Sequence, residues 1–150
     1  MSIEERLQPK GFASAAAAAW VSVVATGDHL SGQAEEVFRG YGITGDQYNV
    51  LRILRGSRPD GLARVEITKR LLRRAPDVTR MLDRLEGNSL IERSRDNSDA
   101  RLSIARITRR GLALLERIDP VIEQVMKSAT APLNDRQLRQ LVVMCDRLMS

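Results

Sequence analysis

The chain has 150 residues, 43% of them hydrophobic and 29% charged, with a net charge of +5, which is typical of a soluble globular domain with a substantial core. Aromatic residues make up 3%, which argues against a protein that binds single-stranded nucleic acid by stacking bases. One cysteine and one histidine exclude an intramolecular disulfide and a multi-cysteine zinc site, and without a nucleophile–base pair or glycine-rich phosphate loop neither an enzyme nor a cofactor is expected.

The longest apolar run spans residues 13–25. It is too short and too rich in alanine to cross a membrane. The acids Glu4 and Glu5 before it make it a poor signal peptide. We therefore expect a cytoplasmic protein with no membrane partner.

Residues 12–41 are predicted to form a long helix that Gly40 and Gly42 end. Such a helix is about 45 Å long, more than one small domain can cover, which indicates a partner. Its apolar stripe consists of Phe12, Ala16, Trp20, Val23, Gly27, Leu30, Ala34, Val37 and Tyr41. Trp20 is interpreted as packing in a dimer or core, with the lining of an effector pocket as the alternative.

A second helix is predicted to begin at Thr44, because Thr44 and Gln47 have the spacing of a capping box. Its buried face would be Tyr48, Leu51 and either Leu54 or Ile53. The turn-rich residues 56–61 follow as a loop.

Residues 64–72 are predicted to form a short helix with Val65, Ile67, Leu71 and Leu72 as its apolar positions. After a connector at residues 73–75, a helix over residues 76–88 should begin with Pro76, since proline is favoured at the first helical position. Its predicted inner face is Val78, Met81, Leu82 and Leu85, and its other faces carry Asp77, Thr79, Arg80, Asp83 and Arg84.

Two strands, Leu90–Arg95 and Arg101–Ile107, are predicted to form a hairpin around the polar turn 96–100. In the second strand Leu102, Ile104 and Ile107 alternate imperfectly with polar residues.

Thr108 is predicted to cap another long helix, which Pro120 should kink or interrupt near Ile118. The apolar face of this helix is Leu112, Leu115, Ile118, Ile122, Val125 and Ala129. A last helix begins at Asn134, with a narrow seam of coiled-coil type made of Leu138, Leu141, Cys145 and Leu148. Cys145 and His29 are interpreted as packing and surface residues rather than sensors.

The order of elements predicts one domain over residues 1–150, mainly α with a small β-hairpin wing. Residues 44–110 form its winged helix-turn-helix core. Residues 12–41 and 111–149 supply N- and C-terminal dimerisation helices. The basic charge agrees, because residues 64–110 hold 13 Lys and Arg against 7 Asp and Glu, the pattern of a module that meets a polyanion. A solvated basic face is the alternative.

Four motifs in order resemble the MarR family of transcriptional regulators over residues 44–118. They are Asp77-Val78-Thr79-Arg80-Met81-Leu82-Asp83-Arg84-Leu85-Glu86, Leu90-Ile91-Glu92-Arg93, Asp96-x-x-Asp99-x-Arg101 and Ile107-Thr108-x-x-Gly111-x-x-Leu114-Leu115. The resemblance implies a triangular homodimer with interleaved terminal helices, usually a repressor, often released from DNA by a small phenolic or anionic effector. Two departures stand out: Ala75 replaces a usual Ser or Thr helix cap, and Ala100 replaces the first of two wing arginines.

Helix 76–88 has the features of a recognition helix, because it has an apolar back and a cationic exposed face. Asp77, Thr79, Arg80 and Arg84 are assigned to the major groove. Arg80 could bind guanine O6 and N7 through two donors. Asp77 could instead only stabilise the helix end, and the whole face could be an ordinary solvated one.

Arg101 is assigned to the minor groove from the wing, with Asp83 or Asp99 holding its guanidinium by a bidentate pair. A surface salt bridge of little value is the alternative. Contacts to phosphates, which add affinity without reading sequence, are assigned to Arg73, Arg74 and Arg95.

The function predicted from the sequence is a sequence-specific regulator of duplex DNA. We expect it to be a repressor that a small molecule releases from a palindromic operator. One alternative is a weakly specific architectural DNA-binding protein without an effector. Another is a helical interaction protein whose wing contacts protein.

Overall fold

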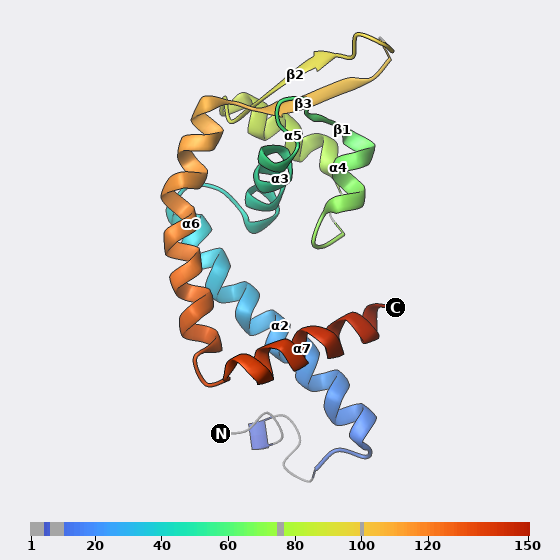
Figure 1. The fold of residues 1–150 in the computed structure, drawn as a ribbon, viewed down its shortest axis with the longest axis vertical. Helices are drawn as coiled ribbons and strands as arrows, with labels where there is room; N and C mark the ends of the chain where they lie inside the picture. Colours follow the sequence, from blue (N-terminus) through green and yellow to red (C-terminus); the bar gives the residue numbers. More distant parts are fainter. Residues whose placement is uncertain (1–4, 7–10, 75–76, 100) are drawn as a thin grey trace.

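A computed structural model describes residues 5–6, 11–74, 77–99 and 101–150 (Figure 1). Its helices are α2 (Ala15–Gly40), α3 (Gly45–Gly56), α4 (Arg64–Arg70), α5 (Val78–Gly87), α6 (Arg109–Thr130) and α7 (Asp135–Met149). Its strands are β1 (Leu62–Ala63), β2 (Ile91–Arg95) and β3 (Ser103–Ile107), in an antiparallel sheet of order β1-β3-β2. The predicted helical fold with a small hairpin is confirmed. No helix in the described part of the chain combines the length and apolarity needed to cross a bilayer.

Helix α2 is shorter than the predicted range 12–41, and little of its apolar stripe is covered. The hydroxyl of Ser14 accepts a hydrogen bond from the backbone N–H of Ala17 and caps the helix, which therefore begins after Phe12. Within α2, described throughout, Phe38 is the one buried residue. The side chain of Trp20 is 75% exposed, so it is not packed in the core of its own chain.

The capping box at α3 is confirmed. Thr44 Oγ1 accepts from the backbone N–H of Gln47, and Gln47 Oε1 accepts from that of Thr44. Of the two candidates for the buried face, Leu54 is fully buried and Ile53 is half-buried. The helix thereby fills the centre of a core that α4, α5, the sheet and α6 enclose.

A polar cluster joins α3 to α6. The Tyr48 hydroxyl donates to Asp119 Oδ1 at 2.7 Å, and Arg55 Nη1 donates to Asp119 Oδ2 at 2.6 Å. Burial raises the pKa of Asp119, but the hydrogen bonds from Arg55 and Tyr48 outweigh it and hold that pKa below its ordinary value. Helix α6 runs through Pro120 as one span, so of the two predicted effects near Ile118 the interruption is excluded and a kink stays a prediction.

The ionisation of Tyr48 offers a direct test of this cluster. Burial, together with the hydrogen bond to Asp119, raises the pKa of Tyr48 to about 12. Since an unfolded tyrosine titrates near pH 10, the neutral phenol stabilises the fold fully below about pH 10, and this contribution is lost as the pH rises towards 12. In a Tyr41→Phe variant, where Tyr48 is the one remaining tyrosine, tyrosinate absorbance should appear about two pH units later in the folded chain than in urea. Equal titration in both states would contradict the cluster.

The segment around α4 differs most from expectation. The helix ends at Arg70 instead of residue 72, and Leu72, predicted to be apolar packing, is 84% exposed. Strand β1 was not predicted, because two residues carry no periodicity. The turn into β1 uses Gly61 at φ +77°, where an added Cβ would meet the carbonyl of Ala105 on β3. Close pairing with β3 therefore creates this strand.

The hairpin is confirmed with shorter strands and a corrected inner face. Ile91 pairs with Ile107 and Arg95 with Ser103. Ala105 and Ile107 are buried, Ile104 is half-buried and Leu102 is exposed. The alternation was thus right for Ile107 and wrong for Leu102, and it missed the small Ala105, which fills the core at the centre of β3.

The start of α6 fixes the hairpin to the helical layer. Thr108 Oγ1 accepts from the backbone N–H of Gly111 and donates to the carbonyl of Ser89. Gly111 is buried, and a Cβ there would meet the carbonyl of Leu90 and the side chain of Ile107. Both ends of the wing therefore meet at the first turn of α6.

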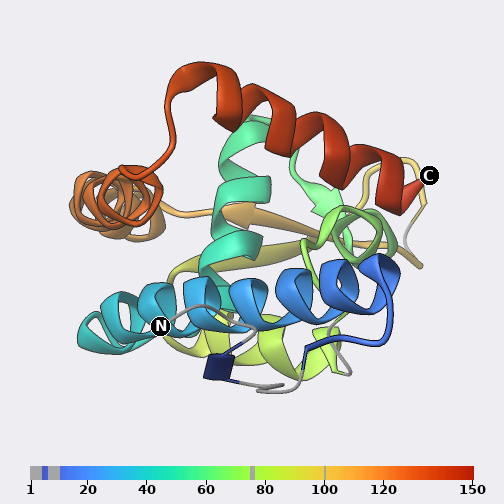
Figure 2. The same ribbon diagram turned by 90° about the horizontal axis from the view of Figure 1, so that it is seen from below.

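Helix α7 has almost no partner in its own chain. Asn134 and Gln137 form a capping box at its start, yet none of its residues, all of which are described, is buried. In Figure 1 it crosses α2 in projection, but Figure 2 shows the two helices on opposite sides of the molecule. The predicted seam is therefore uncovered: Leu138 and Cys145 are half-buried, while Leu141 and Leu148 are exposed.

Candidate nucleic-acid interface

The candidate interface is built on α5, which begins two residues later than predicted. Asp77 is its N-cap, and Asp77 Oδ1 accepts from the backbone N–H of Arg80 at 2.9 Å. The carboxylate of Asp77 therefore caps a helix in which Ala75 stands at the position of the usual Ser or Thr cap. Ala75 and Pro76 lie outside the described residues. Two roles were predicted for Asp77, a contact with DNA bases and the stabilisation of the helix end. Its hydrogen bond with the backbone of Arg80 supports the second.

The two faces of α5 are sharply divided. Val78, Leu82 and Leu85 are buried against the core, and Met81 is half-buried, as predicted. The opposite face, exposed to solvent, carries Thr79, Arg80, Asp83 and Arg84. Helical spacing of three and four residues places these four side chains together. The exposed face has the width and the chemistry needed to lie in a major groove.

A cleft of about 300 Å³ borders this face on the side of the wing. Thr79 from α5, Arg101 and Leu102 from the hairpin, and Arg64 from α4 are among the residues that line it. Arg101 is exposed. The structure therefore brings the wing arginine and the first turn of α5 to the same cleft, although they are far apart in the sequence.

A second cleft, of about 260 Å³, borders the other side of the exposed face. Arg80 and Arg84 line it together with Asp77 and with Thr44 and Asp46 at the start of α3. The exposed face of α5 thus lies between the wing and the N-terminus of α3, and Arg80 and Arg101 are exposed on its two flanks.

Arg93 on β2 links the hairpin to α5 through ion pairs with two acids. Its Nη2 lies 2.6 Å from Asp83 Oδ1 and 2.6 Å from Glu86 Oε2, and its backbone N–H donates to Glu86 Oε1. The hydrogen bond from Arg93 lowers the pKa of Glu86 below its ordinary value. The sequence included Arg93 in a family motif without assigning it a role. The role of Arg93 depends on its position opposite two acids of a neighbouring helix, and the sequence alone does not show that position.

The predicted support of Arg101 is corrected by these contacts. Asp83 binds Arg93, and Asp99 Oδ1 accepts from the backbone N–H of Arg101 at 3.0 Å. In the described part of the chain no ion pair joins either carboxylate to the guanidinium of Arg101. Arg93 pairs with Ala105 on β3, whereas Arg101 lies exposed in the turn between β2 and β3, so these contacts hold the strands of the wing but not its turn.

Arg73 also departs from its predicted role. Its Nη2 lies 3.3 Å from Glu35 Oε1 and 3.2 Å from Asp46 Oδ1, so two carboxylates hold the guanidinium assigned to a phosphate. Both oxygens of Glu35 also accept from the backbone N–H of Gly45. Arg73 thereby ties the connector before α5 to α2 and α3. The other two arginines assigned to phosphates, Arg74 and Arg95, are exposed.

Metal-dependent chemistry has no visible site in this region. Among the residues that the structure describes, no group of three or more His, Cys, Asp or Glu side chains could hold a metal ion. The exposed face of α5 and the wing carry cationic side chains, which suit the grooves and phosphates of a duplex.

Comparison with known proteins agrees with this architecture. The profile of the MarR family matches residues 43–103. A structure of a MarR transcription factor from Planctomyces limnophilus is 31% identical, covers 90% of this chain and 98% of its own, and has a TM-score of 0.71. A search of curated protein sequences found no match.

Two more distant structures share the fold. One is a mutant Escherichia coli MarR in complex with operator DNA, 20% identical over 100% of both chains, with a TM-score of 0.80. The other is Bordetella bronchiseptica BpsR, whose DNA binding is regulated by 6-hydroxynicotinic acid; it is 22% identical over 85% of this chain and 90% of its own, with a TM-score of 0.77. The close relative and the family profile together confirm the resemblance seen in the motifs, and the chain belongs to the MarR family of transcriptional regulators.

Proposed function

We propose that this chain binds a palindromic operator in duplex DNA as a homodimer and represses transcription until a small anionic or phenolic effector releases it. The observation that carries the proposal is the exposed face of α5, flanked by the wing on one side and by the start of α3 on the other. Each subunit would use residues 44–110 for DNA and residues 12–41 and 111–149 for the dimer.

The proposed contacts follow from what each side chain can reach. Arg80 and Thr79, in the first turn of α5, contact base edges in the major groove, and Arg84 contacts a base or phosphate one turn further on. Arg101 enters the minor groove, and Arg74 and Arg95 bind phosphates. Asp77 caps the helix and Asp83 holds the wing through Arg93, so both position cationic groups without touching DNA.

The proposed dimer rests on apolar surface that the chain leaves exposed. Exposed large apolar side chains on the terminal helices are Trp20, Val23, Val24, Leu30, Val121, Met126, Leu141, Val142, Val143, Met144, Leu148 and Met149. Apolar side chains exposed in such number along helices mark an interaction site in a soluble protein. A second copy is the proposed occupant, since an isologous pair would set two α5 helices at one duplex.

Selection of bound duplexes from a random pool tests this function. A sequence-specific dimer should enrich an inverted repeat whose half-sites are centred about 10 base pairs apart. The structural neighbour BpsR supports the proposal of an effector, because its DNA binding is regulated by an aromatic carboxylate. Equal binding of all duplexes would instead favour the weakly specific architectural protein. If the chain binds no duplex even at low salt, the proposal of DNA binding is wrong.

A further inference from the structure

We propose that Asp119 is a positioning residue that sets the angle between the winged core (residues 44–110) and the second half of α6. It thereby sets the distance between half-sites that a dimer prefers. The carboxylate of Asp119 joins α6 to α3 immediately before Pro120. The inference rests on the proposed function, since it concerns a dimer bound to two half-sites, and it adds the residues that make this dimer selective for one spacing.

Helix α6 belongs to both parts of the molecule. Its first half packs on the winged core, where Gly111, Leu115 and Ile118 are buried. Its second half leads to α7, and Val121 and Met126 are exposed there, on the surface proposed for the dimer (Figure 1). The angle between the winged core and the second half of α6 therefore decides where α5 lies relative to a second subunit.

Pro120 weakens α6 at the boundary between these two halves. Proline has no backbone N–H, so the carbonyl of Glu116 receives no helical hydrogen bond from position 120. The proline ring also crowds that carbonyl, which makes the helix easiest to bend at this point. Contacts made by the turn before Pro120 should therefore have a large effect on the direction of the second half.

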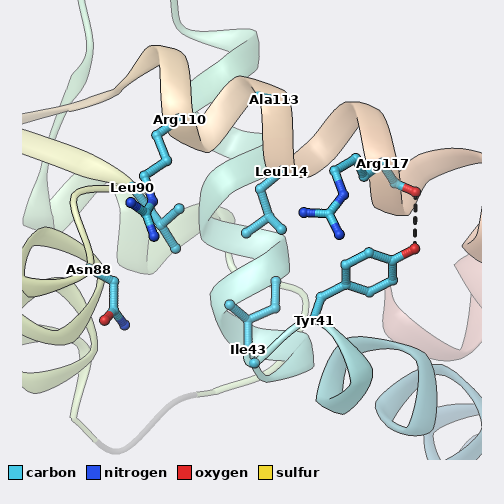
Figure 3. A pocket seen from close by; sticks show the side chains of 9 residues that line it. Tyr41, Ile43, Asn88, Leu90, Arg110, Ala113, Leu114 and Arg117 are labelled. Atoms are coloured by element: carbon cyan, nitrogen blue, oxygen red, sulfur yellow. Dashed lines mark hydrogen bonds between the residues drawn. The ribbon is translucent and has the colours of Figure 1, made fainter.

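Hydrogen bonds hold this turn of α6 on two sides. Asp119 accepts on both carboxylate oxygens, from the Tyr48 hydroxyl at 2.7 Å and from Arg55 Nη1 at 2.6 Å. The two donors belong to residues about 10 Å apart along α3, so they come from different turns of that helix. At the end of α2 the Tyr41 hydroxyl donates to the carbonyl of Arg117 at 3.3 Å (Figure 3). The turn before the proline is thus bound to α3 and to the end of α2.

Apolar packing alone would restrict the angle of α6 less sharply. The hydrophobic effect, which buries Leu115 and Ile118, is not directional, whereas a hydrogen bond requires a particular distance and angle. Tyr48 is itself held in place, because it is buried and its ring stacks on that of Phe38 with 4.5 Å between centroids. Asp119 therefore binds α6 to a fixed group of the core.

The spacing of half-sites on a duplex makes this angle measurable. One additional base pair moves a half-site by about 3.4 Å and turns it by roughly 35° about the duplex axis. A dimer whose winged cores are held at a fixed angle must distort to follow this change. A dimer that bends more easily at Pro120 follows it at lower cost, so loss of the Asp119 contacts should relax the spacing preference without abolishing DNA binding.

Fluorescence anisotropy of the full chain with operators whose half-sites are about 9 to 12 base pairs apart tests this role. The unmodified chain should prefer one spacing. In Asp119→Asn the ratio of affinities for the preferred operator and for one that is a base pair longer should fall at least about threefold. Arg55→Gln should relax the preference in the same way. The combined variant should relax it no further, because both substitutions break one contact.

Glu123→Gln is the matched control. It makes the same change from carboxylate to amide on α6, but Glu123 forms its ion pair with Lys127 of the same helix. The ratio of affinities should therefore stay as in the unmodified chain. A variant that is merely less stable would lose affinity for every operator by the same factor, so the ratio separates a positioning role from a structural one.

Circular dichroism and thermal melting check the folding of each variant. Should Asp119→Asn be unfolded, Arg55→Gln must show the relaxed preference. An unchanged ratio in the folded variants, an equal fall in Glu123→Gln, or an unmodified chain that binds all spacings alike overturns the inference. An unmodified chain that binds no duplex contradicts the proposed function as well. A clear preference that Asp119→Asn retains contradicts the role of Asp119 alone.

Discussion

A chain with Leu141→Glu and Leu148→Glu should be a monomer at micromolar concentration and should bind its operator at least about 100-fold more weakly than the unmodified dimer. Leu141 and Leu148 are 42% and 70% exposed in the single chain and lie seven residues apart on one face of α7. Buried glutamates at both positions of a helical seam would repel each other across a two-fold axis. Loss of the second subunit also removes the high effective concentration of the second half-site.

Sedimentation equilibrium measures the assembly, and fluorescence anisotropy with the selected operator measures the affinity. The Gln140→Glu/Arg147→Gln variant is the matched control, because it changes the net charge by the same two units on an adjacent stripe of α7. It should remain a dimer. An unmodified chain that sediments as a monomer would remove the basis for the two-half-site geometry. A glutamate variant that stays dimeric would exclude this seam from the interface.

Arg80→Ala is expected to reduce the preference for the cognate operator over a scrambled duplex by roughly 10- to 100-fold, the loss of about 1–3 kcal/mol of base discrimination. Arg80 is exposed in the first turn of α5, and its own backbone N–H is fixed by Asp77. The position of its Cα is therefore set before DNA binds, so the substitution should change recognition without changing the fold.

Arg95→Ala is the comparison, because Arg95 is exposed at the end of β2 and is proposed to contact a phosphate. It should weaken binding to both duplexes alike and make the dependence of affinity on salt less steep. Anisotropy titrations with each duplex at several salt concentrations distinguish the two effects. Equal loss of specificity in the two variants would disprove the division of roles between base and phosphate contacts.

The contact of Arg73 changes what is expected of that residue. Because Glu35 and Asp46 already hold its guanidinium, Arg73 links the connector before α5 to the long helix α2. The guanidinium of Arg73 would have to break its ion pairs with Glu35 and Asp46 before it could bind a phosphate. Arg73 therefore has a positioning contact for the connector in the structure, and its contact with a phosphate stays a prediction.

Much of the architecture could be predicted because it depends on local spacing. The capping box at Thr44, the cap at Thr108 and the helix start at Asn134 each depend on residues within one helical turn, and all three are present. The amphipathic pattern of α5 could also be predicted, because the residues of its buried and exposed faces are close neighbours in the chain. The family motifs then set the order of the elements.

The identities of partners across the fold could not be predicted in the same way. Strand β1 exists because β3 pairs with it, Asp83 meets Arg93 rather than Arg101, and Leu72 is exposed where its helix stops early. The contacts of Asp119 with Tyr48 and Arg55 likewise join two separated segments. Local periodicity and capping thus determined the helices, the hairpin and the face that α5 exposes. The tertiary structure alone decided which charged groups pair, because those contacts depend on distances that the order of residues does not contain.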